Sequence, residues 1–124
     1  IATQECIHAS DTYKQALLNG KETGTVVIKR SLGAPARAIK SQYTEAIIQK
    51  ELEGATYEDL KNDISGKANQ HYIYDGNEES GFGWAGQVMG LIHDVPTVQQ
   101  LVDDMIQSAT IGRKRLDEIF GGTI

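Results

Sequence analysis

Only one segment of this chain has the pattern of a well-formed β-strand, and this limits the folds that the chain can adopt. Residues 25–29 read TVVIK, a β-branched run bounded by Gly24 and Gly33. A single strand cannot form a sheet, because its backbone groups need a neighbouring strand. Most other apolar residues recur at helical spacing. The sequence therefore predicts a mostly helical chain with one or two strands, residues 1–7 being the tail of a second.

Four segments carry the start and stop signals of amphipathic helices. Capping residues such as Ser10 precede them, and glycines such as Gly20 follow them in the left-handed conformation. Pro35 suits the first position of a helix, where no hydrogen-bonded N–H is needed. The predicted helices cover residues 12–18, 35–53 and 57–66, with a polar turn region over 67–83 and a final helix from residue 98 to about 120.

The final helix has the clearest signals. Thr97 and Gln100 form a capping box, and Pro96 prevents a helix from entering from upstream. Such a helix either packs on other helices or covers a sheet whose strands lie mostly elsewhere, and periodicity does not decide between these. Its apolar face is predicted to be buried and consists of Val98, Leu101, Val102, Met105, Ile106 and Ala109.

Bulk properties exclude several functional classes. With 124 residues the chain has room for one modest domain, and its net charge of −5 argues against a nucleic-acid binder. No apolar run is long enough for a membrane span. The single cysteine, Cys6, fits a reducing cytoplasm, and the three histidines lack metal-ligand spacing. We therefore expect a cytoplasmic protein with no nucleic-acid, membrane or metal site.

Residues 81–86 read GFGWAG and match the G-x-G-x-x-G pattern of dinucleotide-binding proteins. In that motif a strand must come directly before the glycines, so that the pyrophosphate can reach the N-terminus of the following helix. Here residues 75–80 read DGNEES, a polar turn with three acids that would repel a pyrophosphate. The spacing of these glycines is therefore interpreted as a coincidence.

A different resemblance extends along nearly the whole chain. The segments IATQEC from Ile1, TVVI from Thr25 and GAPARAIK from Gly33 occur in the same order as GNEESG from Gly76 and the AGQ and GLI pieces that follow. This ordered set resembles the C-terminal third of the nitronate monooxygenases, formerly called 2-nitropropane dioxygenases. The flavin-dependent enoyl-acyl-carrier-protein (enoyl-ACP) reductases are similar and share the Ala-Gly-Gln motif.

The resemblance implies an α/β fold, the C-terminal part of an FMN-binding (β/α)₈ TIM barrel with a small α-rich inserted domain. Residues 1–24 would hold the end of the last barrel strand and the following helix, and residues 25–80 the inserted domain. Residues 81–124 would hold the flavin-side Ala-Gly-Gln segment and the terminal barrel helices. The implied activity is oxidation of alkyl nitronates by dioxygen.

Site residues are carried over only where the motifs match. Ala85, Gly86 and Gln87 are predicted to form a wall beside the FMN, because glycine admits a planar ring and glutamine offers a donor and an acceptor. Thr3 is predicted to reach the cofactor's rim, and Trp84 to line the substrate side. Their alternatives are helix packing and a core aromatic residue. No catalytic residue is predicted, because the family's catalytic histidine and phosphate loops lie upstream of Ile1.

Three functions stay open at this point. The preferred one is a nitronate monooxygenase of which this chain is only the C-terminal portion, with the remainder of the barrel upstream. The alternatives are a flavin-dependent enoyl-ACP reductase and a non-catalytic α-rich interaction domain. Arg37 could reach an anionic group, although a solvated side chain or a surface salt bridge is the simpler expectation. The 124 residues alone are expected to be inactive, since an eight-stranded barrel needs about 200 residues or more.

Overall fold

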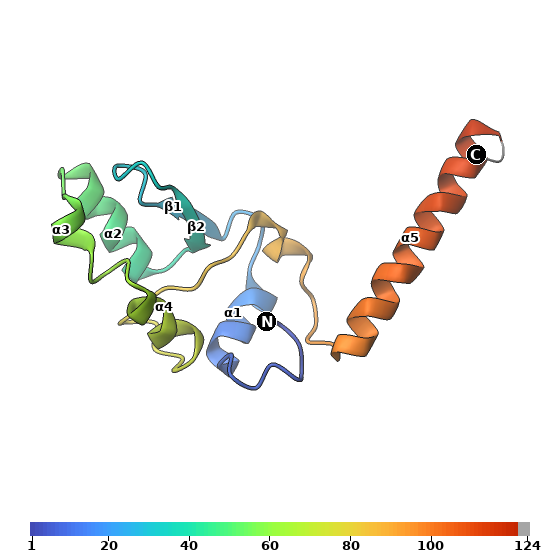
Figure 1. Cartoon of the computed structure of the whole chain (residues 1–124), viewed down its shortest axis with the longest axis horizontal. Helices are drawn as coiled ribbons and strands as arrows, with labels where there is room; N and C mark the ends of the chain where they lie inside the picture. The colour runs from blue at the N-terminus through green and yellow to red at the C-terminus, as the bar shows by residue number, and fades with distance from the viewer. Residues whose placement is uncertain (122–124) are drawn as a thin grey trace. The chain divides into compact units, whose positions relative to one another are not determined.

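The computed structural model describes residues 1–121. The glycine pair Gly121–Gly122 is the predicted stop of the final helix, and its second residue lies outside the described residues. The chain divides into two compact units. One contains Ile1–Ala2 and Cys6–Asp94, and the other contains Thr3–Glu5 and the segment from Val95 onward. The elements in chain order are α1 (Asp11–Asn19), β1 (Thr25–Ile28), β2 (Ala36–Ile39), α2 (Gln42–Leu52), α3 (Tyr57–Leu60), α4 (Gly66–Ile73), the 3₁₀ helix η1 (Gln87–Leu91) and α5 (Val98–Phe120) (Figure 1).

β1 and β2 form an antiparallel pair in the first unit (Figure 1). The strand predicted from TVVIK is confirmed as β1, but the helix predicted from Pro35 is wrong over its first residues, which contain β2. Strand pairing outweighs helical propensity there, because each β2 residue gains a partner in β1. The register joins Thr25 to Ile39, Val26 to Ala38, Val27 to Arg37 and Ile28 to Ala36.

A third extended segment pairs with the free edge of β2. Trp84 forms an antiparallel bridge with Ala38. The Ile39 N–H donates to the Gly83 carbonyl at 2.9 Å, and the Ala85 N–H donates to the Arg37 carbonyl at 3.4 Å. The glycine-rich segment is thus a strand-like edge of the sheet. It is not the turn of a dinucleotide-binding motif, in agreement with the interpretation of its glycine spacing as a coincidence.

Successive residues of an extended segment point to opposite faces, and the two faces of this small sheet meet different cores. One face carries Ala38 and Phe82, and its core also holds Ile28, Ile47, Leu60 and Ala68. The other face carries Ile39, and its core also holds Ala9, Tyr13, Leu17, Tyr72, Ile73 and Met89. The sheet therefore separates a core built with α2, α3 and α4 from a core built with α1, α4 and η1.

Several helix boundaries agree with their capping signals. α1 begins after Ser10, whose side chain accepts from the Tyr13 N–H, but Gly20 is extended at φ −73° and not left-handed. α2 begins after Ser41, which forms a capping box with Thr44. The helix predicted from Pro35 therefore starts at Gln42, where this capping box satisfies the first backbone N–H groups.

Two further expectations are corrected. The short helix predicted over 57–66 ends at Leu60, and a new helix, α4, begins after Ser65 in a region predicted as turn. Ser65 accepts from the Ala68 N–H, a cap that the polar composition of this region hides. Residues 1–7, predicted as a strand tail, form turns and irregular chain, because no neighbouring strand pairs with them in the described structure.

α5 occupies the second unit and begins at the predicted capping box of Thr97 and Gln100. The Glu5 carboxylate also accepts from the Val98 N–H at 2.9 Å, which places a negative charge at the helix N-terminus. The helix continues through Gly112 and ends at Gly121, which is left-handed at φ 72°. Among residues 1–121, neither α5 nor any shorter helix is long and apolar enough to cross a membrane.

The predicted burial of the α5 apolar face is wrong for this structure, since no residue of α5 is buried. Periodicity marks a face that suits an apolar partner, but it does not supply that partner. The basic side chains of residues 113–115 are exposed. The exposed apolar residues on this face of α5 are Val98, Leu101, Val102, Met105, Ile106, Leu116, Ile119 and Phe120.

Candidate functional site

The predicted site residues of the first unit are consecutive, but their side chains divide between the two faces of the sheet. Trp84 shares a face with Phe82, and the two rings meet edge to face with centroids 4.6 Å apart. The Lys29 ammonium lies 5.3 Å from the centroid of the Trp84 ring, in a cation–π contact. Trp84 is only partly buried, so it combines core packing with an accessible edge.

Ala85 points to the opposite face from Trp84, because neighbouring residues of an extended segment alternate. Gly86 and Gln87 follow at the start of η1, and both are exposed. The Gln87 side chain makes no hydrogen bond within the described chain, so its amide can still donate and accept. Ala85, Gly86 and Gln87 therefore form an open surface, which we call the AGQ wall.

Gly86, like Gly66 and Gly112, has no reason within its own unit to be glycine. Its φ is −91°, a conformation that any residue adopts, and a Cβ there would meet only the Val88 Cγ1, at 3.8 Å. By contrast, a Cβ on Gly81 would lie 2.0 Å from the Ala68 carbonyl oxygen. The space beside Gly86 is thus free on the surface of the unit.

Thr3 belongs to the second unit, together with Gln4 and Glu5. The Gln4 N–H donates to the Pro96 carbonyl at 2.9 Å, which joins this short segment to the chain just before α5. The structure describes each unit by itself, so it gathers Trp84 and the AGQ wall but not Thr3. The role of Thr3 at the cofactor's rim stays a prediction.

Alternation also places a residue that the sequence interpretation did not include in the site. Arg37 is the cross-strand neighbour of Ala85, because the Ala38–Trp84 bridge sets the register. Its guanidinium Nη1 donates to the Thr25 Oγ1 at 3.0 Å. In the sequence, Arg37 and Ile39 alternate with small alanines, which is the period-2 pattern of a strand. The helix predicted from Pro35 obscured this signal.

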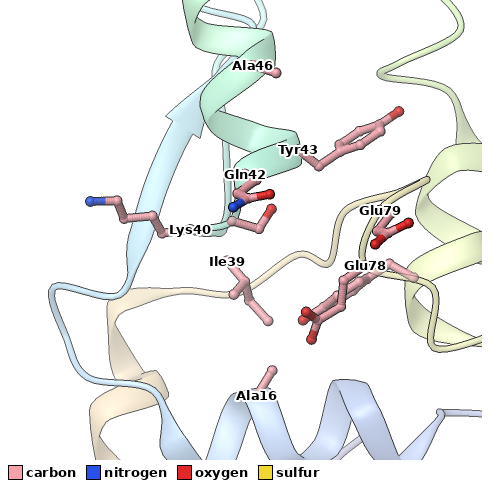
Figure 2. A pocket seen from close by; sticks show the side chains of 10 residues that line it. Ala16, Ile39, Lys40, Gln42, Tyr43, Ala46, Glu78 and Glu79 are labelled. Carbon is pink, nitrogen blue, oxygen red and sulfur yellow. The ribbon is translucent and has the colours of Figure 1, made fainter.

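A cavity lies elsewhere in the first unit. It has a volume of about 720 Å³, and Figure 2 shows the Glu78 and Glu79 carboxylates on the segment after α4. Two acids at its wall disfavour an anionic substrate or a flavin phosphate. The lining residues are Ala16, Ile39, Lys40, Ser41, Gln42, Tyr43, Ala46, Tyr72, Glu78 and Glu79.

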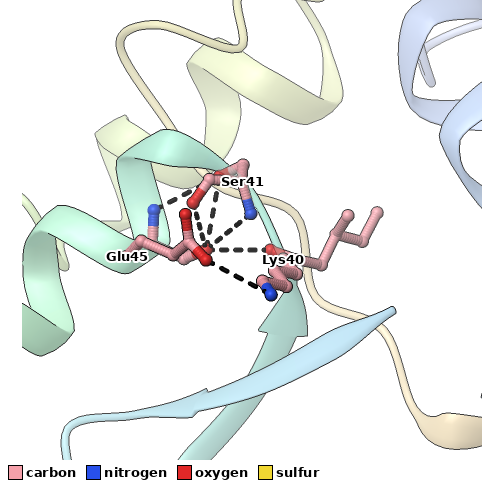
Figure 3. Close-up of polar contacts among 5 residues, drawn as sticks. Lys40, Ser41 and Glu45 are labelled. Atoms are coloured by element: carbon pink, nitrogen blue, oxygen red, sulfur yellow. Dashed lines mark hydrogen bonds and ion pairs between the residues drawn. The ribbon is translucent and has the colours of Figure 1, made fainter. Parts of the chain in front are cut away.

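The β2–α2 junction beside this cavity is held by local polar contacts (Figure 3). The Thr44 hydroxyl donates to the Ile39 carbonyl at 3.1 Å, and the Ser41 N–H donates to the Thr44 Oγ1 at 2.9 Å. Lys40 and Glu45 form an exposed ion pair at 3.4 Å. Lys40 thus has a carboxylate partner already, and these contacts account for the junction as a structural element.

Two buried tyrosines lie between the cavity lining, to which Tyr72 belongs, and the Trp84 segment, to which Tyr13 is hydrogen-bonded. Tyr13 and Tyr72 meet edge to face with centroids 5.8 Å apart, and the Tyr13 hydroxyl donates to the Trp84 carbonyl at 2.6 Å. Burial, with smaller effects of Glu78 and Tyr13, raises the pKa of Tyr72 to about 12. Burial also raises the pKa of Tyr13. Both hydroxyls therefore stay protonated near neutral pH, and that of Tyr13 serves as the donor to Trp84.

No group of three or more metal-ligating side chains occurs within residues 1–121. The candidate site is accordingly a surface with a partly exposed aromatic residue, a glycine with free space and an unpaired amide. Such a surface can contact a planar ligand and hydrogen-bond its edge, but the described groups include no evident general base at this surface.

Comparison with protein families and curated proteins gives a consistent result. The family model described as nitronate monooxygenase matches residues 1–108. A "Probable nitronate monooxygenase" of Staphylococcus aureus strain JH9 is 31% identical over 85 residues, which are 68% of this chain and 24% of that protein. One from Staphylococcus saprophyticus is 27% identical over 101 residues, 82% of this chain and 28% of that protein. The chain spans about a quarter of these relatives.

Solved structures show the same fold. The structure of FabK from Thermotoga maritima matches 90% of this chain and 35% of that chain, with a TM-score of 0.81 and 22% identity. A point mutant of FabK matches 95% of this chain and 34% of that chain, with a TM-score of 0.75 and 21% identity. At this level of identity the likeness describes the fold and not the activity.

Proposed function

Because the chain belongs to the nitronate monooxygenase family, we propose that it supplies one wall of the flavin site in a longer oxidoreductase. The flavin in this proposal is FMN, and the longer protein is a (β/α)₈ barrel. Residues 25–80 are its small inserted domain, between barrel-associated segments at residues 1–24 and 81–124. The fold likeness to FabK and the quarter-length coverage of the curated relatives support this arrangement.

The AGQ wall carries the proposal. Gly86 has free space beside it that its own unit does not require, and the exposed Gln87 amide has unused hydrogen-bonding capacity. A flat ring that approaches this surface needs a residue without a Cβ and a neighbour that can hydrogen-bond to the ring edge. These two residues therefore fit a flavin, and Ala85 adds a small apolar contact.

The proposed reaction is oxidation of an alkyl nitronate by dioxygen. Bound FMN would supply the path for electrons between these two substrates. The residues of this chain would hold and shield the reactants, with Gly86 and Gln87 in contact with the cofactor. The substrate-side role of Trp84 stays a prediction, because its side chain lies on the opposite face of the sheet from Ala85. The general base would come from the barrel region, because no described group at the AGQ wall suits that role.

The exposed apolar face of α5 supports the proposal independently. Eight large apolar side chains on one helix face are far more than a soluble surface usually presents together. A helix that covers a barrel buries such a face. In the longer protein, the remainder of the proposed barrel would be the partner.

A flavin-dependent enoyl-ACP reductase is the second candidate. The Ala-Gly-Gln motif and the fold likeness to FabK favour it. An assay of the full-length protein separates the two. We expect oxygen consumption with propyl nitronate and no oxidation of NADH with an enoyl thioester. The opposite pattern would support the reductase instead. If the protein binds flavin but shows neither activity, both candidates are contradicted.

Gly86→Val in the full-length protein tests the AGQ wall itself. We expect the affinity for FMN to fall at least tenfold, because the side chain fills the space that the ring needs. The thermal stability of the apoprotein should change little, because φ at Gly86 is −91° and a Cβ there has no close neighbour. Fluorescence titration with FMN measures the first and calorimetry the second. Unchanged FMN affinity would exclude Gly86 from the cofactor surface.

A further inference from the structure

Arg37 is half-buried on the same sheet face as Ala85, directly beside the AGQ wall. The backbone bond from the Ala85 N–H to the Arg37 carbonyl fixes the two residues as cross-strand neighbours, with side chains to the same side. Val27 pairs with Arg37 from the other strand, so the guanidinium stem lies between an apolar residue and the wall. Its position is therefore set by strand register.

The guanidinium is oriented but lacks a counter-ion. Its Nη1 donates to the hydroxyl of Thr25, a buried residue, and no carboxylate among residues 1–121 forms an ion pair with it. A guanidinium has five N–H donors in a rigid planar fork, so most of them remain available. A half-buried cation in this condition gains most from an anion that reaches it from outside the unit.

The acids of the first unit do not serve this role. Glu78 and Glu79 line the large cavity beside Tyr72, whereas Glu51 accepts from Lys29 and Ser31 backbone N–H groups. The Arg37 guanidinium thus has no carboxylate partner within the described residues. Its positive charge favours an anionic ligand beside the wall.

We infer that Arg37 binds the two oxygens of the substrate's nitronate group. This rests on the proposed function. A nitronate is a planar anion with two oxygens on one nitrogen, and its shape resembles a carboxylate, which guanidinium groups bind through parallel N–H···O bonds. Thr25 holds the fork in place, so Arg37 is a specificity-determining residue and Thr25 its positioning residue.

Steady-state kinetics of the full-length flavoprotein with propyl nitronate test this inference. Arg37→Met should raise KM about 10- to 100-fold with a much smaller change in kcat, since a charge-assisted bond is lost. Arg37→Lys keeps the charge but not the fork, so its KM should lie between those of the wild type and Arg37→Met. Thr25→Val should raise KM less than Arg37→Met. Arg30→Met, an exposed cation in the same hairpin, is the matched control and should leave KM unchanged.

The phosphate of FMN is a second anion that the Arg37 guanidinium could bind. The flavin content and FMN affinity of each variant test this alternative. Loss of FMN affinity in Arg37→Met with an unchanged KM in the reconstituted enzyme would assign the guanidinium to the cofactor and overturn the inference. An unchanged KM and FMN affinity would also overturn it, while the proposed function stands if the wild type is active. A flavin-loaded wild type that does not oxidise propyl nitronate contradicts both proposals.

Discussion

Gly83 occupies a position where any side chain would collide with two aromatic rings. A Cβ there would lie 2.6 Å from Tyr72 Cδ1 and 2.7 Å from Tyr13 Cε2. These rings form the edge-to-face pair behind the sheet. We expect Gly83→Ala to lower the free energy of unfolding by about 1–3 kcal/mol, as overpacked cores do. Urea unfolding followed by circular dichroism measures the change.

Gly66→Ala is the matched control for this substitution. Gly66 is the first residue of α4, and a Cβ there would have no neighbour within 4 Å. Alanine should therefore be neutral or slightly stabilising, because it also favours the helix. Equal losses in the two variants would show that the Tyr13–Tyr72 contact does not restrict Gly83.

Tyr72 gives the fold a dependence on alkaline pH. Its pKa is raised to about 12 by burial first, then by Glu78 and Tyr13. The unfolded chain releases this proton near pH 10 and the folded chain does not, so the stabilising contribution of Tyr72 is complete below pH 10. It should be lost between about pH 10 and 12. We expect Tyr72→Phe to flatten the fall in urea midpoint over this interval; an unchanged slope would contradict the assignment.

For single residues, the motif resemblance selected candidate site residues, but the directions of their side chains could not be predicted from the sequence. Ala85, Gly86 and Gln87 were selected from sequence; Gly86 and Gln87 are exposed and Ala85 is partly buried, and their contact with a flavin stays a prediction. That Trp84 and Ala85 face opposite sides could not be predicted, because the segment's pairing with β2 was unknown. Arg37 was treated as a surface cation for the same reason.

The turn after β1 depends on a single carboxylate of α2. Lys29 has a φ of 63°, an uncommon conformation for a residue with a side chain. The Glu51 carboxylate accepts from the Lys29 N–H at 3.0 Å and from the Ser31 hydroxyl at 2.8 Å. Glu51→Ala should therefore lower the free energy of unfolding by about 1–2 kcal/mol. Thermal unfolding of the purified variant measures the loss.

Glu53→Ala provides the comparison, because Glu53 follows α2 and contacts only the Gln49 amide, at 2.8 Å on the surface. Its loss should stay within about 0.5 kcal/mol. A Glu51 variant as stable as this control would show that the left-handed turn holds without the carboxylate.

Elements were predicted well where the signals are local. The TVVIK strand, the Ser10 cap and the Thr97 capping box are read from neighbouring residues, and each agrees with the structure. Errors occurred where a distant segment decides the outcome. Residues 36–39 become a strand because β1 and the Trp84 segment lie on either side, and neither neighbour can be recognised from local periodicity.

Across the whole molecule, α5 presents an apolar face without a cover in the described residues. Its periodicity marks an apolar stripe along one helix face, and that stripe is present. Whether the stripe is buried depends on the assembled structure. A quarter-length chain need not contain the partner of each of its faces.

The isolated chain should therefore self-associate through α5. Met105, which is 60% exposed, lies on the apolar face. Met105→Glu should reduce the concentration-dependent mass seen by sedimentation velocity, with little change in thermal stability. Gln107→Glu adds the same charge outside the apolar face and should leave association unchanged. Cooperative melting of Met105→Glu at a much lower temperature would instead show that α5 is packed in the isolated chain.

We expect the three glycines of the segment at 81–86 to be retained for two different reasons. Gly81 and Gly83 are required by atoms of their own unit, so every descendant that keeps this fold should retain them. Gly86 is required by nothing in its unit, so under the proposed function it is the flavin that would preserve it. In a lineage that lost the flavin, Gly86 would be the first of the three to drift, while its neighbours would stay fixed.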